Sequence, residues 1–172
     1  MEQEATLLTL AEVSIAFAGF ASIAVLFRRR AAGRWAPEDA LRFQVMIISS
    51  LSALFFSLFP LALGAYTISE SAVWAWSSGL LLLALAAAVG GALPRFAKLV
   101  REARASFALA VISLVLIVGA VVLQALNVLS IGFSREPAPY LTGVVLLVLF
   151  CCIEFVRLVA IRPGETEDGA EP

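Results

Sequence analysis

Three polar residues, Glu12, Gln124 and Asn127, lie within long apolar stretches and are the first candidates for chemistry. An ionisable side chain in hydrocarbon costs at least about 2.5–3.5 kcal/mol, so Glu12 needs a partner or a role. Counted at about 1.5 Å per helical residue, all three reach the outer half of a helical bundle. There a neutral Glu12 would donate a hydrogen bond to an amide. We therefore expect a polar cluster of Glu12, Gln124 and Asn127.

Two roles are open for Glu12. It would handle protons or cations in a conductor, or it would hold neighbouring helices together. At helical spacing Glu12 shares a face with Ala16 and Gly19, and such small residues let another helix approach closely. One carboxylate without a second acidic partner is a poor relay, which favours the structural role.

A second polar group lies in the inner half of the predicted bundle. Glu154 and Arg157 are three residues apart and share one face of a helix. Arg42, at the start of the second apolar segment, is placed to reach Glu154. We expect ion pairing within this Arg42–Glu154–Arg157 cluster, and an inner gate or an anion contact is the alternative.

The remaining residue types argue against other chemistry. The chain has no histidine, which excludes His-based acid–base catalysis and most zinc sites. Cys151 and Cys152 are adjacent and lack other soft ligands, so we expect them to fill apolar space. No Gly-rich phosphate loop or Ser/His/Asp combination is present in the sequence. We therefore predict no catalytic residues, no metal, no cofactor and no nucleic-acid partner.

The elements that must position these residues are five apolar segments. The chain is 62% hydrophobic and 15% charged, whereas soluble chains are typically about 45–50% apolar and about 25% charged. Each segment has about 20 residues or more, enough to cross a bilayer as a helix. The expected helices span about 5–27, 40–66, 72–93, 106–133 and 139–161. Residues 1–162 are therefore predicted to form an all-α integral membrane bundle.

The basic residues predict its orientation. Eleven of the 12 Lys and Arg residues fall on one side of the five segments, and only Arg135 falls on the other. The positive-inside rule makes the first side cytoplasmic, so the N-terminus lies outside and the C-terminus inside. Both outer connections are then tight hairpins. Residues 163–172 are acidic and are expected to form a disordered cytoplasmic tail.

The second inner connection, residues 94–105, has one apolar and one basic face at helical spacing. It would either lie on an anionic leaflet as a short helix or extend a neighbouring transmembrane helix, with its charges enforcing topology. We favour the extension of a neighbouring transmembrane helix, because the positive-inside rule by itself accounts for the basic residues of this connection. In the first case the lipid-headgroup contacts are Arg95, Lys98, Arg101 and Arg104.

Small residues form stripes on two further segments. The stripe on the second segment includes Ala53 and Ser57, and Pro60 is expected to kink this helix. The small residues of this stripe would contact a neighbouring helix. Alternatively, the helix broken at Pro60 would expose backbone carbonyls to an ion. The third segment carries two small-residue pairs within residues 86–91, which predict helix packing or self-association.

The run AEVSIAFAGFASIAVLFRRR (residues 11–30), followed by Trp35, Pro37, Pro60 and Trp74, resembles small multi-pass bacterial membrane proteins of unknown function. The resemblance implies a bacterial inner-membrane location and no particular activity. We expect a non-enzymatic protein of the lipid bilayer that self-associates or serves as an accessory subunit of a membrane complex. The alternative is a homo-oligomeric proton or cation channel or transporter component that uses Glu12.

Overall fold

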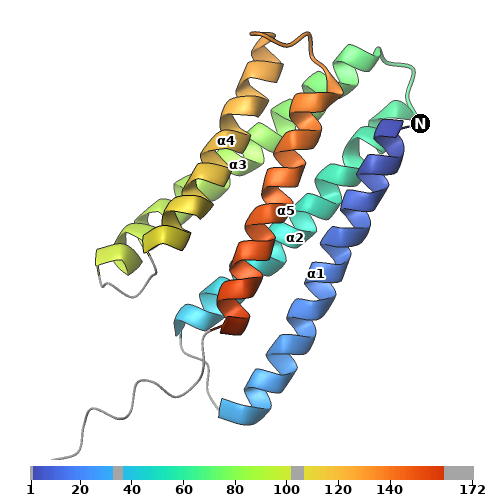
Figure 1. Ribbon diagram of the computed structural model, residues 1–172. Helices are drawn as coiled ribbons and strands as arrows, with labels where there is room; N and C mark the ends of the chain where they lie inside the picture. The colour runs from blue at the N-terminus through green and yellow to red at the C-terminus, as the bar shows by residue number, and fades with distance from the viewer. Residues whose placement is uncertain (1, 33–36, 102–106, 161–172) are drawn as a thin grey trace, which may run out of the picture.

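The apolar segments form long helices that pack side by side in the computed structural model (Figure 1). The structure describes residues 2–32, 37–101 and 107–160. The helices are α1 (Glu2–Ala32), α2 (Pro37–Gly64), α3 (Glu70–Arg101), α4 (Phe107–Leu129) and α5 (Pro137–Ala160). Each contains 19 to 22 residues apolar enough to cross a membrane. The predicted all-helical bundle of five helices of spanning length is therefore confirmed.

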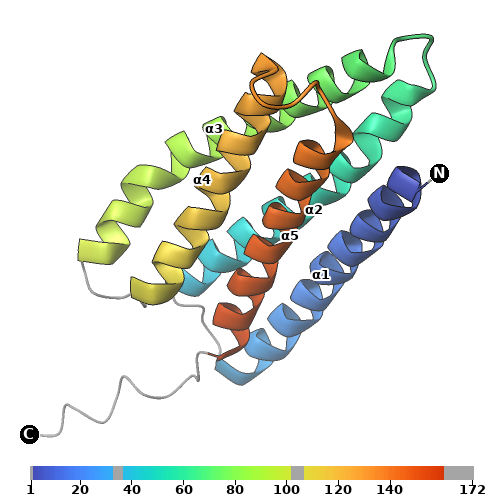
Figure 2. The same cartoon turned by 45° about the horizontal axis from the view of Figure 1, so that its top comes forward.

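Helix α5 holds the bundle together, because it contacts each of the other four helices. Helix α1 packs against α2 and α5 at one edge, and within the described residues it contacts neither α3 nor α4. Figure 2 shows the same order from a second direction, with α1 at one edge and the α3–α4 pair at the other. The connections 65–69 and 130–136 lie together at one end, which we name the hairpin end.

The core follows α5 along its length. Its buried side chains Tyr140, Val144 and Leu147 pack against Leu81 of α3 and Ala53 of α2. Ala53 is fully buried, as expected for the small-residue stripe of α2, and lets the two helix backbones approach closely. The core of the bundle therefore lies where α5 packs against α2 and α3.

Two helices extend beyond their predicted apolar segments. Helix α1 continues to Ala32 and α3 to Arg101, because the basic residues that end both segments are good helix formers. Residues 94–101 therefore extend α3 and do not form a separate helix. Arg104 and the 163–172 tail lie outside the described residues, and so do Trp35 and the other residues of 33–36.

Helix α4 ends at Leu129, four residues before its predicted end at 133. Ser130 adopts a left-handed conformation with a φ of 57°. Its N–H donates to the Asn127 carbonyl at 3.3 Å, and the Ile131 N–H donates to the Leu126 carbonyl at 3.0 Å. These two bonds form a Schellman C-cap, which usually has glycine at the left-handed position. Because serine stands there instead, the sequence carries no clear signal for this end.

Candidate functional site

Asn127 is fully buried and joins three elements at the hairpin end. Its Nδ2 donates to Ser78 Oγ of α3 at 2.8 Å and to the Glu136 carbonyl at 3.1 Å. Its Oδ1 accepts a hydrogen bond from the Glu136 N–H at 3.1 Å. One amide therefore closes the α4–α5 connection and ties it to α3, and both of its polar atoms have partners.

Gln124 lies one turn further along α4 and is also fully buried. Its Nε2 donates to the Pro139 carbonyl at the start of α5, at 2.9 Å. Gly143 makes this approach possible, because a Cβ at that position would overlap Gln124 Nε2. Gln124 Oε1 is buried and has no hydrogen-bond partner among the described groups. Together Gln124 and Asn127 form a junction of α3, α4 and α5, which we name the hairpin junction.

Glu12 does not join this junction, and the expected Glu12–Gln124–Asn127 cluster is wrong in that respect. The buried side of α1, which carries Leu7 and Ala11, packs towards α2 and α5. Glu12 lies on the opposite side, is exposed, and makes no hydrogen bond or ion pair with any described residue. Helix α5 stands between α1 and α4, so similar depth along two helices does not bring their side chains together.

The proline of α2 has a partner that the sequence analysis missed. Pro60 has no N–H, which leaves the Phe56 carbonyl without its usual helical donor. The buried Tyr140 hydroxyl of α5 donates to this carbonyl. Trp74 packs on Tyr140 with ring centroids 5.8 Å apart. The carbonyl that a bound ion would need is therefore occupied by a side chain of the same chain.

Glu154 is the buried carboxylate of the opposite end, with 5% of its surface exposed. The Ser113 hydroxyl of α4 donates to its Oε1 at a long 3.5 Å. Arg42 lies on α2 and Arg157 on α5, but their side chains lie outside what the structure describes, so the expected ion pairing stays a prediction. Ser113 was not expected as a partner of Glu154.

The two polar regions are separated along α5 by an apolar layer. Tyr140 and Glu154 are 14 positions apart, about 21 Å along a helix. Buried Val144, Leu147 and Val148 lie between them. Ser50 Oγ of α2 is buried and has no hydrogen-bond partner among the described groups. Between Tyr140 and Glu154, the buried side chains of α5 are therefore apolar apart from the Cys151 thiol.

The basic positions of α3 were expected to meet lipid headgroups. Arg95, Lys98 and Arg101 lie on the last turns of α3, but their side chains, like all of Arg104, lie outside what the structure describes. Headgroup contact therefore stays a prediction. Over the described part of the chain, no three His, Cys, Asp or Glu side chains come together as a metal site would require.

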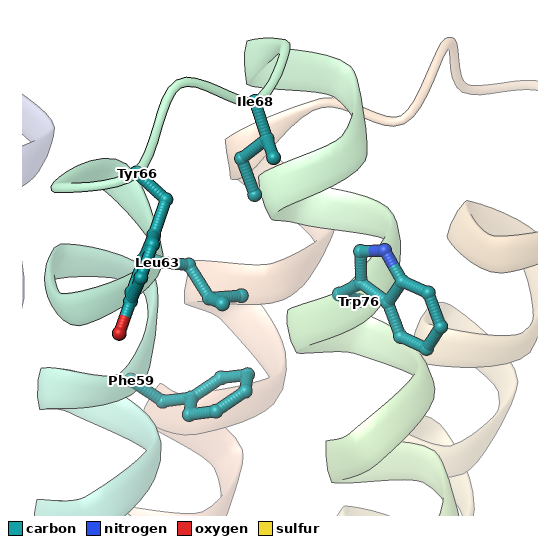
Figure 3. A pocket seen from close by; sticks show the side chains of 5 residues that line it. All are labelled: Phe59, Leu63, Tyr66, Ile68 and Trp76. Carbon is teal, nitrogen blue, oxygen red and sulfur yellow. The ribbon is translucent and has the colours of Figure 1, made fainter.

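A shallow groove lies beside the α2–α3 connection. Figure 3 shows its lining, with Phe59, Leu63 and Tyr66 on the α2 side and Ile68 and Trp76 on the α3 side. Tyr66 and Trp76 are each 70% exposed, so these two side chains are mostly uncovered. The lining carries no charged group, and its polar side-chain atoms are the Tyr66 hydroxyl and the Trp76 indole N–H.

Comparison with known proteins adds no relative. The chain matches no protein-family model, no curated protein and no solved structure. Its functional interpretation therefore rests on its own residues and their arrangement.

Proposed function

We propose that this chain is a non-enzymatic integral membrane protein of the bacterial inner membrane. Its five helices of spanning length support insertion. Large apolar side chains are exposed on all five helices, among them Phe20, Ile48 and Leu83, and a surface of this kind suits lipid as solvent. The sequence run that resembles small multi-pass bacterial membrane proteins supports the same location.

The distribution of basic residues supports an orientation with the N-terminus outside and the C-terminus in the cytoplasm. The hairpin end, with its two short connections, is then the outer end. A cysteine-accessibility experiment tests this orientation. We expect Ser69→Cys to react with an impermeant maleimide added outside intact cells, and Ala32→Cys to react only after the cells are opened.

We further propose that the protein self-associates or serves as an accessory subunit of a membrane complex. The carrying observation is that Gly19 of α1 and Gly90 and Gly91 of α3 have open space where a side chain would be. Small residues in membrane helices concentrate where another helix packs. At these positions the described part of the chain supplies no such neighbour, so a helix of another molecule is the expected contact.

Mass measurement in a mild detergent tests the association. One copy weighs 18.3 kDa, so a self-associating protein gives a multiple of this mass after the detergent is subtracted. An accessory subunit instead appears with a second, co-purifying membrane protein. A single copy alone, at every protein concentration and in several detergents, would contradict the proposal.

The conductor considered as an alternative depended on Glu12 beside Gln124 and Asn127. Since Glu12 lies on the far side of α1, that alternative loses its main support. We expect liposomes containing the protein to show no more proton or cation flux than empty liposomes. Flux that disappears in Glu12→Gln would replace the proposed function with conduction.

A further inference from the structure

The groove beside the α2–α3 connection is lined by large side chains. Phe59 and Leu63 extend from α2 towards α3, and Ile68 closes the groove at the connection (Figure 3). Tyr66 and Trp76 stand at its two borders. The groove has a volume of about 430 Å³, within the range of about 300–1,000 Å³ that is usual for sites of small molecules. We name it the aromatic groove, and its lining suits an apolar ligand.

The aromatic groove lies at one boundary of the spanning segments. The apolar span of α2 ends at Gly64, and that of α3 begins at Glu70. Phe59 therefore lies inside a span, whereas Ile68 belongs to the connection 65–69. In the proposed membrane the groove would reach from the headgroup layer into the hydrocarbon.

Apolar surface continues from the groove along α2 for the thickness of one leaflet. Phe55 is half exposed and packs against Phe59 with ring centroids 5.5 Å apart. Phe55 lies nine positions before Gly64, about 14 Å along a helix. Half of a hydrocarbon layer of about 30 Å is about 15 Å thick. The groove and its continuation therefore match the depth of one leaflet, which is the reach of a lipid acyl chain.

Trp76 supplies a hydrogen-bond donor at the border of the groove. Its side chain is mostly exposed, and its indole nitrogen lies on the ring edge nearer the hairpin end (Figure 3). The N–H has no acceptor among the described residues. An indole N–H is a donor only, so its partner must be an acceptor such as the ester or phosphate oxygens of a phospholipid. Tryptophan side chains concentrate at this depth because one part of the ring system is apolar and the N–H is polar.

Other occupants fit the groove less well. Helices pack together in membranes over small residues, and none of the five lining residues is small. The segment 163–172 carries four carboxylates, and it follows α5, which ends at the opposite end of the bundle (Figure 1). An acyl chain is uncharged and flexible, so it follows an uneven surface of aromatic and aliphatic side chains. The lining therefore favours a lipid over a helix or the acidic segment.

We propose that the aromatic groove binds one acyl chain of a phospholipid from the leaflet at the hairpin end, with the Trp76 N–H donating to an ester oxygen of that lipid. The proposal rests on the proposed function, because it requires insertion in a membrane. No charged residue lines the groove, so phosphatidylethanolamine and phosphatidylglycerol should bind equally. A lipid held by the basic residues of α3 would instead lie in the other leaflet and prefer the anionic phosphatidylglycerol.

Photolabelling of the full chain in vesicles of these two phospholipids identifies the surface. A small fraction of the lipid carries a diazirine in its acyl chain. Val122 on α4 is the matched comparison, because it lies seven positions from the hairpin end of its span, against five for Phe59, and is more exposed. We expect severalfold more label on Phe59 than on Val122. Labelling that follows exposed area, with Val122 ahead, would overturn the bound acyl chain and leave membrane insertion standing.

Mass spectrometry of the protein released from mild detergent counts the lipid that stays bound. We expect one phospholipid on each parent chain. Trp76→Phe keeps a ring and removes the N–H, so it should weaken lipid retention about 3- to 20-fold, the range for one hydrogen bond between membrane helices. Trp74→Phe is the matched control, because its N–H donates to Glu70 Oε1 at 3.4 Å and does not line the groove. This control should retain lipid as the parent does, and circular dichroism confirms that both variants are folded.

Three results would overturn the proposal. The first is equal lipid retention by Trp76→Phe and the parent. The second is a preference for phosphatidylglycerol, which would move the bound lipid to the basic residues of α3. The third is a lipid-free dimer that Trp76→Leu separates, which would assign the groove to a second copy. None of these results removes the protein from the membrane, whereas its absence from the membrane fraction of cells would overturn the proposed function as well.

Discussion

The hairpin junction and the side of α1 that carries Glu12 both place polar residues on helices apolar enough to span a membrane, yet these residues lie in opposite surroundings. At the junction, Asn127 and Gln124 are fully buried and bond to groups of the same chain. On the side of α1 that faces away from the bundle, Glu12 is exposed and makes no hydrogen bond or ion pair with a described residue. The polar side chains of the junction find partners within one copy of the chain, whereas Glu12 finds none among the described residues of that copy.

The largest loss of unfolding free energy is expected at Asn127, because its side chain bonds to α3 and to the α4–α5 connection. Asn127→Leu removes three hydrogen bonds and leaves the Glu136 N–H and the Ser78 hydroxyl without their partner. At roughly 0.6–1.7 kcal/mol for each bond, we expect a loss of about 2–5 kcal/mol of unfolding free energy. Unfolding by SDS in mixed micelles measures it. A loss below about 1 kcal/mol would mean that the junction is not what holds α3, α4 and α5 together.

The next effect tests the close approach of α4 and α5. Gly143→Ala forces Gln124 Nε2 away from the Pro139 carbonyl and leaves a buried amide unbonded. We expect a loss of about 1–3 kcal/mol in the same unfolding experiment. Gly79→Ala is the matched control, because a Cβ there meets nothing within 4 Å. Alanine also favours the helix, so this control should unfold no more easily than the parent.

A smaller effect is expected at the bond between α5 and the proline of α2. Tyr140→Phe removes the donor to the Phe56 carbonyl and should cost about 0.6–1.7 kcal/mol of unfolding free energy. Pro60→Ala restores an N–H that bonds this carbonyl within α2. In a Pro60→Ala background, Tyr140→Phe should therefore cost less than it does in the parent. Equal costs in both backgrounds would show that Tyr140 acts through packing, such as its contact with Trp74.

These regions also separate what a sequence can predict from what it cannot. Apolar segments long enough to cross the hydrocarbon layer predict five helices. A count of residues along each helix predicts the depth of Glu12, Gln124 and Asn127. Which helices touch is not contained in such counts, because all five segments are similarly apolar. Which helices lie next to each other depends on how side chains fit along α5. The expected cluster therefore had its three residues at similar depth but placed Glu12 beside α4, which α1 does not contact.

The Tyr140 contact could have been anticipated in part. A proline at position 60 always leaves the carbonyl at 56 without a helical donor, and a buried carbonyl needs one. The sequence offers several donors at the same end of the bundle, including Trp74, Gln124 and Tyr140. Only the arrangement of α2 against α5 selects Tyr140. The end of α4 at Ser130 was hidden for a different reason, since serine rarely takes the left-handed position that it occupies there.

The smallest effect is the one that most sharpens the contrast between the two regions. Because Glu12 is exposed and makes no hydrogen bond or ion pair with a described residue of its own copy, Glu12→Leu should change the unfolding free energy of a single copy by less than about 0.5 kcal/mol. The measurement is made in excess detergent, where copies are separated. A destabilised single copy would show that Glu12 is bonded within its own chain, and this side of α1 would then resemble the hairpin junction.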